Sequence, residues 1–452
     1  METKFLGVIF DHKLTFLPHI KQLRKRCERS LNMLRVLSNT FWGAGRTALL
    51  RIYQALILSR IDYACTVYGT ASASNLKRLD TVHHTALRIC SGAFRTSPVE
   101  SLYAVCHQPS LNFRRMQLSL TFYFRVLSSS SNPLRREIIP LSLQRLYDAR
   151  PSYIPPFNSR MRSLIQTLDF CDIPSQSVNY FLIPPWTISS YYLDCSFVSY
   201  SKSNVSPSIF QQLFTFHRHQ YIQYIAVFTD GSKFPGHVGC GIVVADITYS
   251  YDIPAICSVF TAEAFAILLA LRLISSHSVR KFRINSDSLS VLRQLEHALK
   301  GNDKADSAAR SASSPITLSV PFSDLKNHIR KLFQCLWQHY WDLQGENKLH
   351  SVKPTLEPWP AVHMRRADVK LTRLRHTRLT HLHLLFGEPP PKCNDCNVLL
   401  TIHHILILSP CFNQLRLTFF SSSILCIKDL LDENHHPNIF AFLRTIAILN
   451  SI

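Results

Sequence analysis

Four acidic side chains, each in a short polar or small-residue context, are the residues of this chain best suited to chemistry. They are Asp230 in Thr-Asp-Gly-Ser, Glu263 in Thr-Ala-Glu-Ala, Asp287 in Ser-Asp-Ser, and Asp306 in Gly-Asn-Asp-Lys-Ala-Asp. Mg²⁺ prefers hard oxygen ligands, and two such ions can flank an in-line attack on a phosphodiester. Each acid alone is more often a turn residue or a charge near a helix start. The four together favour a site that holds divalent cations against a phosphate.

A second group of potential ligands lies near the carboxyl end of the chain. Cys393 and Cys396 form a Cys-x-x-Cys turn, followed by His403-His404 and then Cys411. This is the ligand order of a small Cys₂HisCys zinc site, in which thiolates and an imidazole are arranged tetrahedrally. The alternative is a hairpin with buried thiols and no zinc.

Composition limits the class of protein. The chain has 452 residues, enough for two to four domains, and 50 Lys and Arg against 29 Asp and Glu. The net charge of +21 indicates a polyanionic partner, most often nucleic acid. We expect no membrane partner, because no apolar run reaches the roughly 18–20 residues of a membrane-spanning helix. The amino terminus shows no secretory signal and the 13 Cys show no disulfide spacing, so we expect a nuclear or cytoplasmic protein that is not secreted.

The amino-terminal segment, residues 1–126, is predicted to be helical after a short strand over residues 4–10. Apolar residues from Phe16 to Leu37 recur every three or four positions, which predicts a helix with one buried face. Further helices are expected over about 48–59 and 75–90, with Asn75 as an N-cap. The opposite face of the first helix is basic, and three of its side chains are candidate nucleic-acid contacts: Arg24, Lys25 and Arg26. A solvated helix surface is the alternative.

The middle of the chain is predicted to contain the acids on a mixed sheet. Residues 127–215 are rich in Ser, Asn and Pro and are interpreted as a linker. Within residues 216–312 we expect strands over 224–229, 238–249, 256–260 and 280–286, and helices over 261–275 and 288–299. This order predicts an α/β domain, α+β for the whole chain, in which helices cover a mixed sheet. Adjacent strands would bring Asp230 and Asp287 together, with Glu263 over the same edge.

The remaining segments are predicted to be mostly helical. Residues 313–372 form a helical connector, residues 373–416 are basic and contain the Cys/His group, and residues 417–452 form a helical tail. Three arginines of the basic segment are candidate phosphate contacts: Arg373, Arg375 and Arg378. A solvated basic strand explains them equally well.

The acidic stretches 229–232, 261–264, 286–288 and 301–306 resemble the four motifs of a type 1 ribonuclease H domain. The flanks extend the resemblance to the carboxyl-terminal part of the reverse-transcriptase polyprotein of a jockey-like non-LTR retrotransposon. Residues 4–8, 31–34, 61–63 and 92–98 are similar to the thumb region that follows the polymerase palm, and residues 371–381 with the Cys393 region are similar to the family's tail. The resemblance covers most of the chain and is weakest over residues 127–215.

The resemblance implies a set of roles. Asp230, Glu263, Asp287 and Asp306 would coordinate two Mg²⁺ ions that activate water to cut the RNA strand of an RNA–DNA hybrid. The hybrid would be recognised by its shape and 2′-hydroxyls. In the tail, Cys393, Cys396 and His404 would bind zinc. The family's last thiol falls where this chain has Ser409, so Cys411 would take its place.

Two departures from the family shape the expectations. Only 19 residues separate Asp287 from Asp306, where the family has a helix, a further strand and a loop with a histidine, so the sheet is expected to be incomplete. His297 is not at the position of that histidine, and no product-release role is transferred to it. No Asp-Asp pair of the polymerase type precedes residue 126, so no reverse transcription is expected from this chain.

Three hypotheses follow. The first is a Mg²⁺-dependent ribonuclease H domain of a truncated mobile-element protein. The second is a catalytically dead remnant that binds an RNA–DNA hybrid or single-stranded RNA or DNA through its basic segments. The third is a decayed fragment that does not fold.

Overall fold

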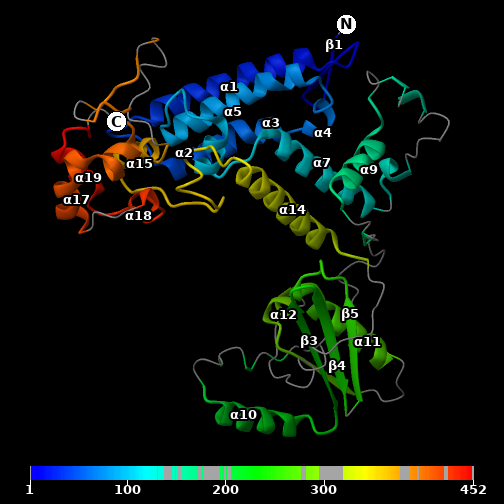
Figure 1. Cartoon of the computed structure of the whole chain (residues 1–452). Helices are drawn as coiled ribbons and strands as arrows, with labels where there is room; N and C mark the ends of the chain where they lie inside the picture. Colours follow the sequence, from blue (N-terminus) through cyan, green and yellow to red (C-terminus); the bar gives the residue numbers. More distant parts are fainter. Residues whose placement is uncertain are drawn as a thin grey trace. The chain divides into compact units, whose positions relative to one another are not determined.

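The computed structural model describes residues 2–129, 131–136, 145–147, 149–150, 154–170, 173, 175–176, 194, 196–197, 200, 205–245, 247–275, 281–294, 319–376, 387, 389–393, 396–421 and 426–449 (Figure 1). These residues form two compact units. The first combines residues 1–119 with 331–452, and the second contains residues 120–330. The amino-terminal and carboxyl-terminal parts of the chain therefore belong to the same unit.

The amino-terminal part of the first unit is a helical assembly behind a short hairpin. Its elements are β1 (Glu2–Phe5), β2 (Val8–Asp11), α1 (Leu17–Leu37), α2 (Arg46–Tyr53), a π-helical turn η1 (Gln54–Leu58), α3 (Ser59–Asp62), α4 (Cys65–Tyr68), α5 (Ala73–Ser91), α6 (Val99–Cys106) and the first part of α7 (Leu111–Leu127). The predicted apolar face of α1 is confirmed, because Ile20, Leu23 and Leu34 are buried and pack with α5 in one core.

Two local predictions for this part are wrong. The expected single strand over 4–10 is a hairpin, because Leu6 and Gly7 both have positive φ, 45° and 86°, and turn the chain back. The third helix begins two residues earlier than expected, so Ser72 and not Asn75 holds the N-cap position. Asn75 lies inside the helix and donates from its side chain to the carbonyl of Thr15.

The carboxyl-terminal part of the first unit packs on these helices. It contains the second part of α14 (Phe322–Asp342), α15 (Arg365–Arg375), a π-helical turn η4 (His404–Leu408), a 3-10 turn η5 (Pro410–Phe412), α17 (Asn413–Phe420), α18 (Ile427–Leu431) and α19 (Ile439–Thr445). Arg365 is buried and donates to the carbonyls of Ile89 and Cys90 at the end of α5. The buried Arg46 donates to the carbonyl of Pro360 at 2.9 Å and pairs with Asp368 at 3.4 Å.

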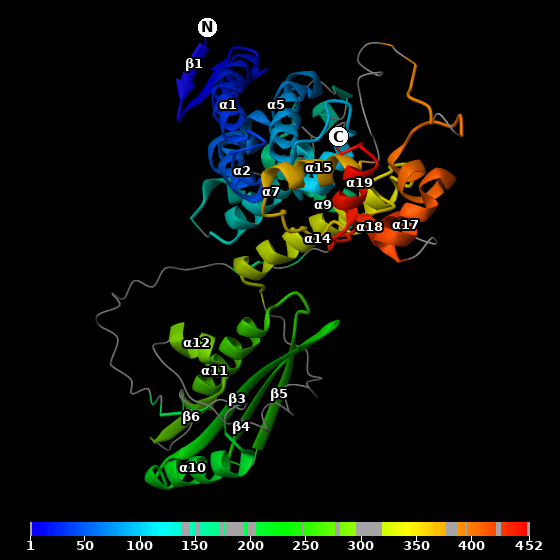
Figure 2. The same ribbon diagram turned by 90° about the vertical axis from the view of Figure 1, so that its left-hand side faces the viewer.

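The second unit contains the mixed sheet. Its elements are the rest of α7, a 3-10 turn η2 (Pro133–Arg136), α9 (Phe157–Thr167), α10 (Pro207–Gln220), β3 (Ile225–Phe234), β4 (His237–Val244), β5 (Ile247–Ile253), α11 (Val259–Ser275), β6 (Phe282–Ser286), α12 (Leu289–Gln294) and the start of α14. The strand order is β5-β4-β3-β6; β3 and β6 are parallel and the other pairs are antiparallel. The predicted mixed sheet with flanking helices is therefore confirmed, and Figure 2 shows α11 along one face of it.

Details of the sheet differ from expectation. The single strand predicted over 238–249 is two antiparallel strands, β4 and β5, because Ala245 adopts a positive φ of 53° between them. The strand predicted over 256–260 is wrong, since α11 begins at Val259. Within the described residues, no helix has both the length and the apolar character needed to cross a bilayer.

Candidate metal centres

Asp230 lies within β3, between the two strands that flank it. β3 continues to Phe234, so Asp230 does not end a strand as expected. It is paired with Gly241 of β4, and the preceding Thr229 is paired with Ser286 of the parallel strand β6. Asp230 follows Thr229 and Asp287 follows Ser286, so the parallel register places the two acids side by side. This is the arrangement predicted from the sequence.

Glu263 reaches this place because α11 comes unusually close to β3. A Cβ atom at Gly231 would lie 2.6 Å from the backbone nitrogen of Glu263, closer than real Cβ contacts allow. Ala262, Ala266 and Ala270 are fully buried and recur every four residues, so the side chains that α11 packs on the sheet are small. The helix starts two residues earlier than predicted, which puts Glu263 in its second turn.

The three carboxylates converge. One ligand oxygen from each of Asp230, Glu263 and Asp287 lies within 4.8 Å of the other two. Asp230 is 5% exposed, Glu263 is 4% exposed and Asp287 is partly buried. Three carboxylates this close repel one another, and a divalent cation offsets that repulsion. The hard oxygen donors fit Mg²⁺, which takes oxygens at about 2.0–2.1 Å. Asp306, the predicted fourth ligand, lies outside the described residues.

Side-chain hydrogen bonds fix the two strands just before the acids. The buried Asn285 of β6 donates from its amide to the carbonyl of Val227 at 3.2 Å, and Thr229 of β3 donates to the carbonyl of Asn285 at 3.4 Å. These bonds run in both directions between β3 and β6, in addition to the ladder. They hold the residues that precede Asp230 and Asp287 in register.

Two charged residues that sequence reasoning missed fix the start of α11. Asp324 of α14 is 4% exposed and accepts hydrogen bonds from the Ser258 amide at 2.9 Å and the Thr261 hydroxyl at 2.6 Å. Lys233 of β3 donates to the carbonyl of Cys257 at 2.5 Å. In the sequence, Asp324 has the pattern of an ordinary acid in a first helical turn, so no local signal identifies its distant partners.

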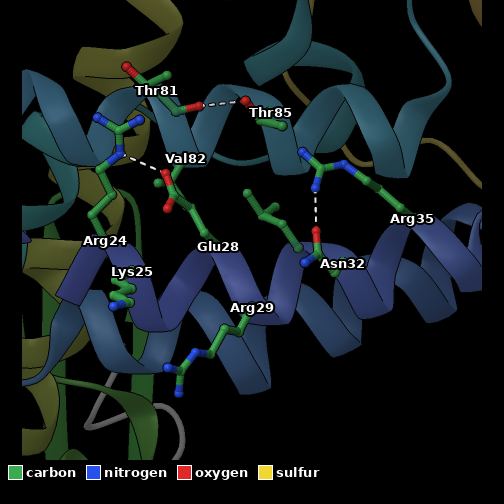
Figure 3. Close-up of a pocket in the computed structure, with 10 residues that line it drawn as sticks. Arg24, Lys25, Glu28, Arg29, Asn32, Arg35, Thr81, Val82 and Thr85 are labelled. Atoms are coloured by element: carbon green, nitrogen blue, oxygen red, sulfur yellow. Dashed lines mark hydrogen bonds and ion pairs between the residues drawn. The ribbon is translucent and has the colours of Figure 1, made fainter. Parts of the chain in front are cut away.

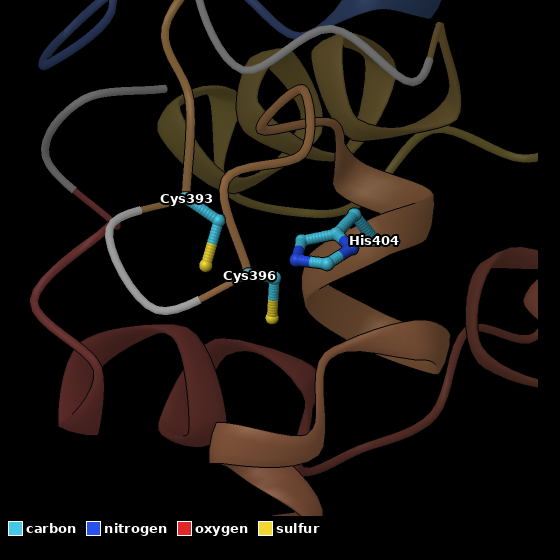
Figure 4. Close-up of side chains that lie close together, drawn as sticks. All are labelled: Cys393, Cys396 and His404. Atoms are coloured by element: carbon cyan, nitrogen blue, oxygen red, sulfur yellow. The ribbon is translucent and has the colours of Figure 1, made fainter.

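The Cys/His group forms a second cluster around a small hairpin. The Cys393 amide donates to the carbonyl of Val398 at 2.8 Å, and the Asn397 amide donates back to the carbonyl of Cys393 at 2.9 Å. Asn397 has a positive φ of 52°, a conformation that asparagine tolerates better than most residues. Ligand atoms of Cys393, Cys396 and His404 all lie within 4.8 Å of one another, and Figure 4 shows the three side chains gathered beside the hairpin.

The two adjacent histidines, His403 and His404, differ in burial. The π-helical turn η4 begins at His404, which is buried, whereas His403 is exposed. The Nε2 atom of His404 is buried and makes no hydrogen bond within the part of the chain that the structure describes. Soft thiols and a buried imidazole at this separation fit Zn²⁺.

Cys411, the fourth predicted ligand, is not among the ligand atoms that lie within 4.8 Å of one another. Desolvation, followed by the neighbouring Cys393 and Cys411 thiols, raises the pKa of the Cys396 thiol above its ordinary value. Ser409, where the family resemblance places the last thiol, is fully buried, and its amide donates to the carbonyl of His404 at 2.7 Å. Cys411 itself is exposed.

The predicted basic contacts of α1 line its surface. Arg24 is paired with Glu28 at 2.8 Å, while Lys25 and Arg26 are exposed. Figure 3 shows Arg24 and Glu28 turned toward α5, and Lys25 and Arg29 pointing away from it. Two shallow depressions of about 490 and 480 Å³ lie along this helix, and arginines line both.

The basic residues near α15 have different surroundings. Arg375 is 3% exposed and donates to the carbonyls of Leu431 and Asp432, so it holds the carboxyl-terminal part together. Arg373 is partly buried and donates to the carbonyl of Gly92 at 3.0 Å. Arg378 lies outside the described residues. A phosphate contact by these three arginines stays a prediction.

Comparison with known proteins gives partial similarities to polymerases of mobile elements. The chain is 29% identical over 150 residues to the probable RNA-directed DNA polymerase from transposon BS of Drosophila melanogaster, covering 33% of this chain and 16% of that protein. It is 28% identical over 140 residues to the RNA-directed DNA polymerase from mobile element jockey of Drosophila funebris, 30% of this chain and 15% of that protein.

A third similarity is to the probable RNA-directed DNA polymerase from transposon X-element of Drosophila melanogaster, 27% identical over 89 residues, 20% of this chain and 10% of that protein. The matches thus span between 10% and 16% of these relatives. No protein-family model matches the chain. No solved structure matches it either.

Proposed function

We propose that the second unit is a ribonuclease H-like domain that hydrolyses the RNA strand of RNA–DNA hybrids with Mg²⁺. The observation that carries the proposal is the convergence of Asp230, Glu263 and Asp287, whose ligand oxygens lie within 4.8 Å of one another. The mixed sheet with α11 on its face supports it, because it is the arrangement that the four acidic motifs lead one to expect. The partial similarity to mobile-element polymerases fits a nucleic-acid substrate.

The chain's own residues would bind and orient the reacting groups. Asp230, Glu263 and Asp287 would hold the cations, with Asp306 as the proposed fourth ligand. Bound Mg²⁺ would lower the pKa of a water molecule and neutralise charge on the scissile phosphate. Gly231 lets α11 approach β3, and Asp324 and Lys233 hold the start of that helix, so Glu263 keeps its place. Preorganised ligands of this kind avoid reorganisation cost during the reaction.

The test compares hydrolysis of an end-labelled RNA–DNA hybrid by the full chain and two matched variants. Asp230→Asn should lower the cleavage rate by at least about 100-fold, the size of effect seen when one charge-stabilising group is lost. Asp252→Asn is the control, because Asp252 is an acid of β5 in the same sheet that pairs with His237 at 3.1 Å. Cleavage by wild type and Asp252→Asn but not by Asp230→Asn supports the proposal. A hybrid left intact by the wild type with Mg²⁺ refutes it.

A second candidate is a nucleic-acid-binding protein that does not cleave. It is favoured by the position of Asp306, which lies only 19 residues after Asp287 in the stretch where the related domains have more chain. A salt-dependent gel shift of the hybrid that survives the double variant Asp230→Asn/Asp287→Asn, with no cleavage by the wild type, would select this candidate.

We also propose that Cys393, Cys396, His404 and Cys411 bind one Zn²⁺. The support is the proximity of the first three ligand atoms, and Cys411 is the proposed fourth ligand. Zinc content of the purified chain, compared with that of Cys396→Ser, tests it. Ser409→Cys should raise the affinity for zinc if a thiol before Pro410 completes the set better than Cys411.

A further inference from the structure

Two large aromatic side chains are exposed just after α1. Phe41 is 78% exposed and Trp42 is 66% exposed. The last two turns of α1 also expose Met33, at 52%, and Val36, at 64%. Exposed apolar groups that cluster in this way usually mark a binding surface, whereas single ones do not. We call Phe41 and Trp42 the aromatic tip.

Hydrogen bonds to the backbone amides fix the turn that carries the aromatic tip. The Asn39 side-chain oxygen accepts hydrogen bonds from the amides of Phe41 at 2.8 Å and Trp42 at 3.4 Å. The Ala44 amide donates to the carbonyl of Leu37 at 2.8 Å and closes the turn. Gly43 is required, because a Cβ there would collide with the carbonyl oxygens of Asn39 and Leu37, the second at 2.5 Å. A turn fixed in this way presents both rings with little ordering cost on binding.

The surroundings of the aromatic tip carry positive charge. Residues 29–61 contain five Arg and no Asp or Glu. The exposed guanidinium of Arg366, on α15, lies 5.1 Å from the centre of the Phe41 ring. A cation over one face of Phe41 attracts a polyanion to the tip and leaves the exposed Trp42 ring available for stacking.

A basic depression lies on the same helix as Met33 and Val36. Its volume is about 480 Å³, and we call it the arginine groove; it is lined by Arg26, Arg29, Ser30, Met33 and Arg60. Arg60 is fixed there, because it donates to the Ser30 hydroxyl at 2.9 Å. Arg26, Arg29, Met33 and Val36 recur at helical spacing and share one face of α1, and the ten residue steps from Arg26 to Val36 span about 15 Å.

We propose that the arginine groove and the aromatic tip form one binding site for single-stranded nucleic acid, with phosphates on the arginines and bases on Trp42 and Phe41. Single-strand sites combine a positive groove with aromatic rings on which bases stack. Bases in a duplex are already stacked and paired, so they cannot reach the tip. The arginines of the groove match a polyanion better than an apolar protein surface. This site lies in the first unit and does not depend on the acidic cluster of the second.

The test measures binding of a fluorescein-labelled 20-nucleotide dT strand and of a 20-base-pair duplex by anisotropy, over a series of salt concentrations. All proteins carry Asp230→Asn, so that the acidic cluster does not contribute. Trp42→Ala should weaken dT binding about 5- to 100-fold, the range for loss of one base stack, and leave the salt slope unchanged. Trp42→Phe should restore most of the affinity. Arg29→Gln should instead reduce the salt slope by about 0.7.

Matched controls separate these effects from general damage. Phe216→Ala removes a phenylalanine of α10 that is 68% exposed, and Arg162→Gln removes an exposed arginine of α9; both should bind dT like the parent. The proposal is overturned if Trp42→Ala binds dT as the parent does, or if duplex binding falls by the same factor. It is also overturned if Trp42→Ala weakens binding to phosphatidylserine vesicles but not to dT.

Discussion

The acidic cluster and the Cys/His cluster bring potential metal ligands together in opposite ways. Asp230, Glu263 and Asp287 come from two strands and a helix, 57 residues apart from first to last, and backbone pairing, a glycine and a stripe of alanines hold them. Cys393, Cys396 and His404 fall within 12 residues, on a hairpin and a π-helical turn. The acidic site is therefore assembled by the domain core, whereas the ligands of the thiol site lie close together in the sequence.

This difference predicts what each metal does for the protein. Asp230 is buried in a sheet that is held by its own register, and Glu263 is buried on the helix packed against it, so cation binding should change reactivity more than folding. The thiol ligands lie on a short hairpin, so metal binding there should supply part of the local folding free energy.

The two regions also bury opposite charge. The carboxyl-terminal part of the first unit contains Lys353, 1% exposed, whose ammonium lies 4.1 Å from the centre of the Trp359 ring and donates to the carbonyl of Glu357. Arg375 covers the same ring at 4.5 Å. Burial, followed by repulsion from Arg375 and Arg46, lowers the pKa of Lys353 to about 8. Buried cations here contact carbonyls and rings, whereas the buried carboxylates of the sheet converge on each other.

The largest effect on the acidic cluster is expected from a substitution of Gly231. Gly231→Ala forces α11 away from β3, because the added Cβ would lie 2.6 Å from the Glu263 backbone. A displacement near 1 Å can cost about 100-fold in rate, and overpacking costs about 1–3 kcal/mol of stability. Hybrid cleavage and thermal unfolding measure the two. Gly345→Ala, where a Cβ meets nothing within 4 Å, is the control. Full activity of Gly231→Ala would show that the position of Glu263 does not depend on the close approach of α11 to β3.

Zinc removal should act locally and more moderately. At free zinc about 100 times the dissociation constant, chelation should speed hydrogen exchange of the Cys393, Asn397 and Leu400 amides by about 100-fold. Amides of β3 and β4 should keep their exchange rates when either zinc or Mg²⁺ is removed. Cys393→Ser should show the fast rates without chelator. Equal exchange of the hairpin with and without zinc would remove the contrast between the two clusters.

The smallest effect sharpens the contrast in buried charge. The folded-state pKa of Lys353, about 8, lies below its unfolded value of 10.5. Between these pH values the unfolded chain binds more protons, so this group makes folding more favourable as pH rises from 8 to 10.5. Reduced for partial solvent screening, the gain is about 2 kcal/mol.

The Lys353→Met variant lacks a titrating group at this position, so its stability should not show this gain between pH 8 and 10.5. The free energy of unfolding of the wild type, minus that of Lys353→Met, should rise over pH 8–10.5 in denaturant titrations. The exposed Lys348→Met variant is the control and should run parallel to the wild type. A pH-independent difference for Lys353→Met would show that its ammonium is solvated.

Much of the acidic site could be predicted because it depends on regular pairing. The sequence places Asp230 and Asp287 on adjacent strands, and β3 and β6 do pair and bring the two acids side by side, although β3 continues past Asp230 to Phe234. The strand boundaries could not be predicted as well. Val259 and Phe260 favour strands but begin α11, and the turn at Ala245 uses a positive φ that its sequence does not require.

The supports of the sites were harder to predict than the ligands. Asp324 stabilises the start of α11 from 63 residues away in sequence, and no local pattern predicts that bond. The sequence does not predict the aromatic tip, because only the structure shows that Phe41 and Trp42 are exposed. The resemblance alone favours His404 over His403, and the structure distinguishes them because His404 is buried beside Cys393 and Cys396 whereas His403 is exposed.

The most direct test of the central claim is a Mn²⁺ titration of the full chain, with free Mn²⁺ followed by electron paramagnetic resonance. Three converging carboxylates should bind Mn²⁺, which takes the same oxygen ligands as Mg²⁺. The Asp230→Asn/Asp287→Asn variant should lose at least about tenfold in affinity, while Asp252→Asn should match the wild type. If the double variant binds Mn²⁺ as tightly as the wild type, the acidic cluster is not a cation site and the nuclease proposal is wrong.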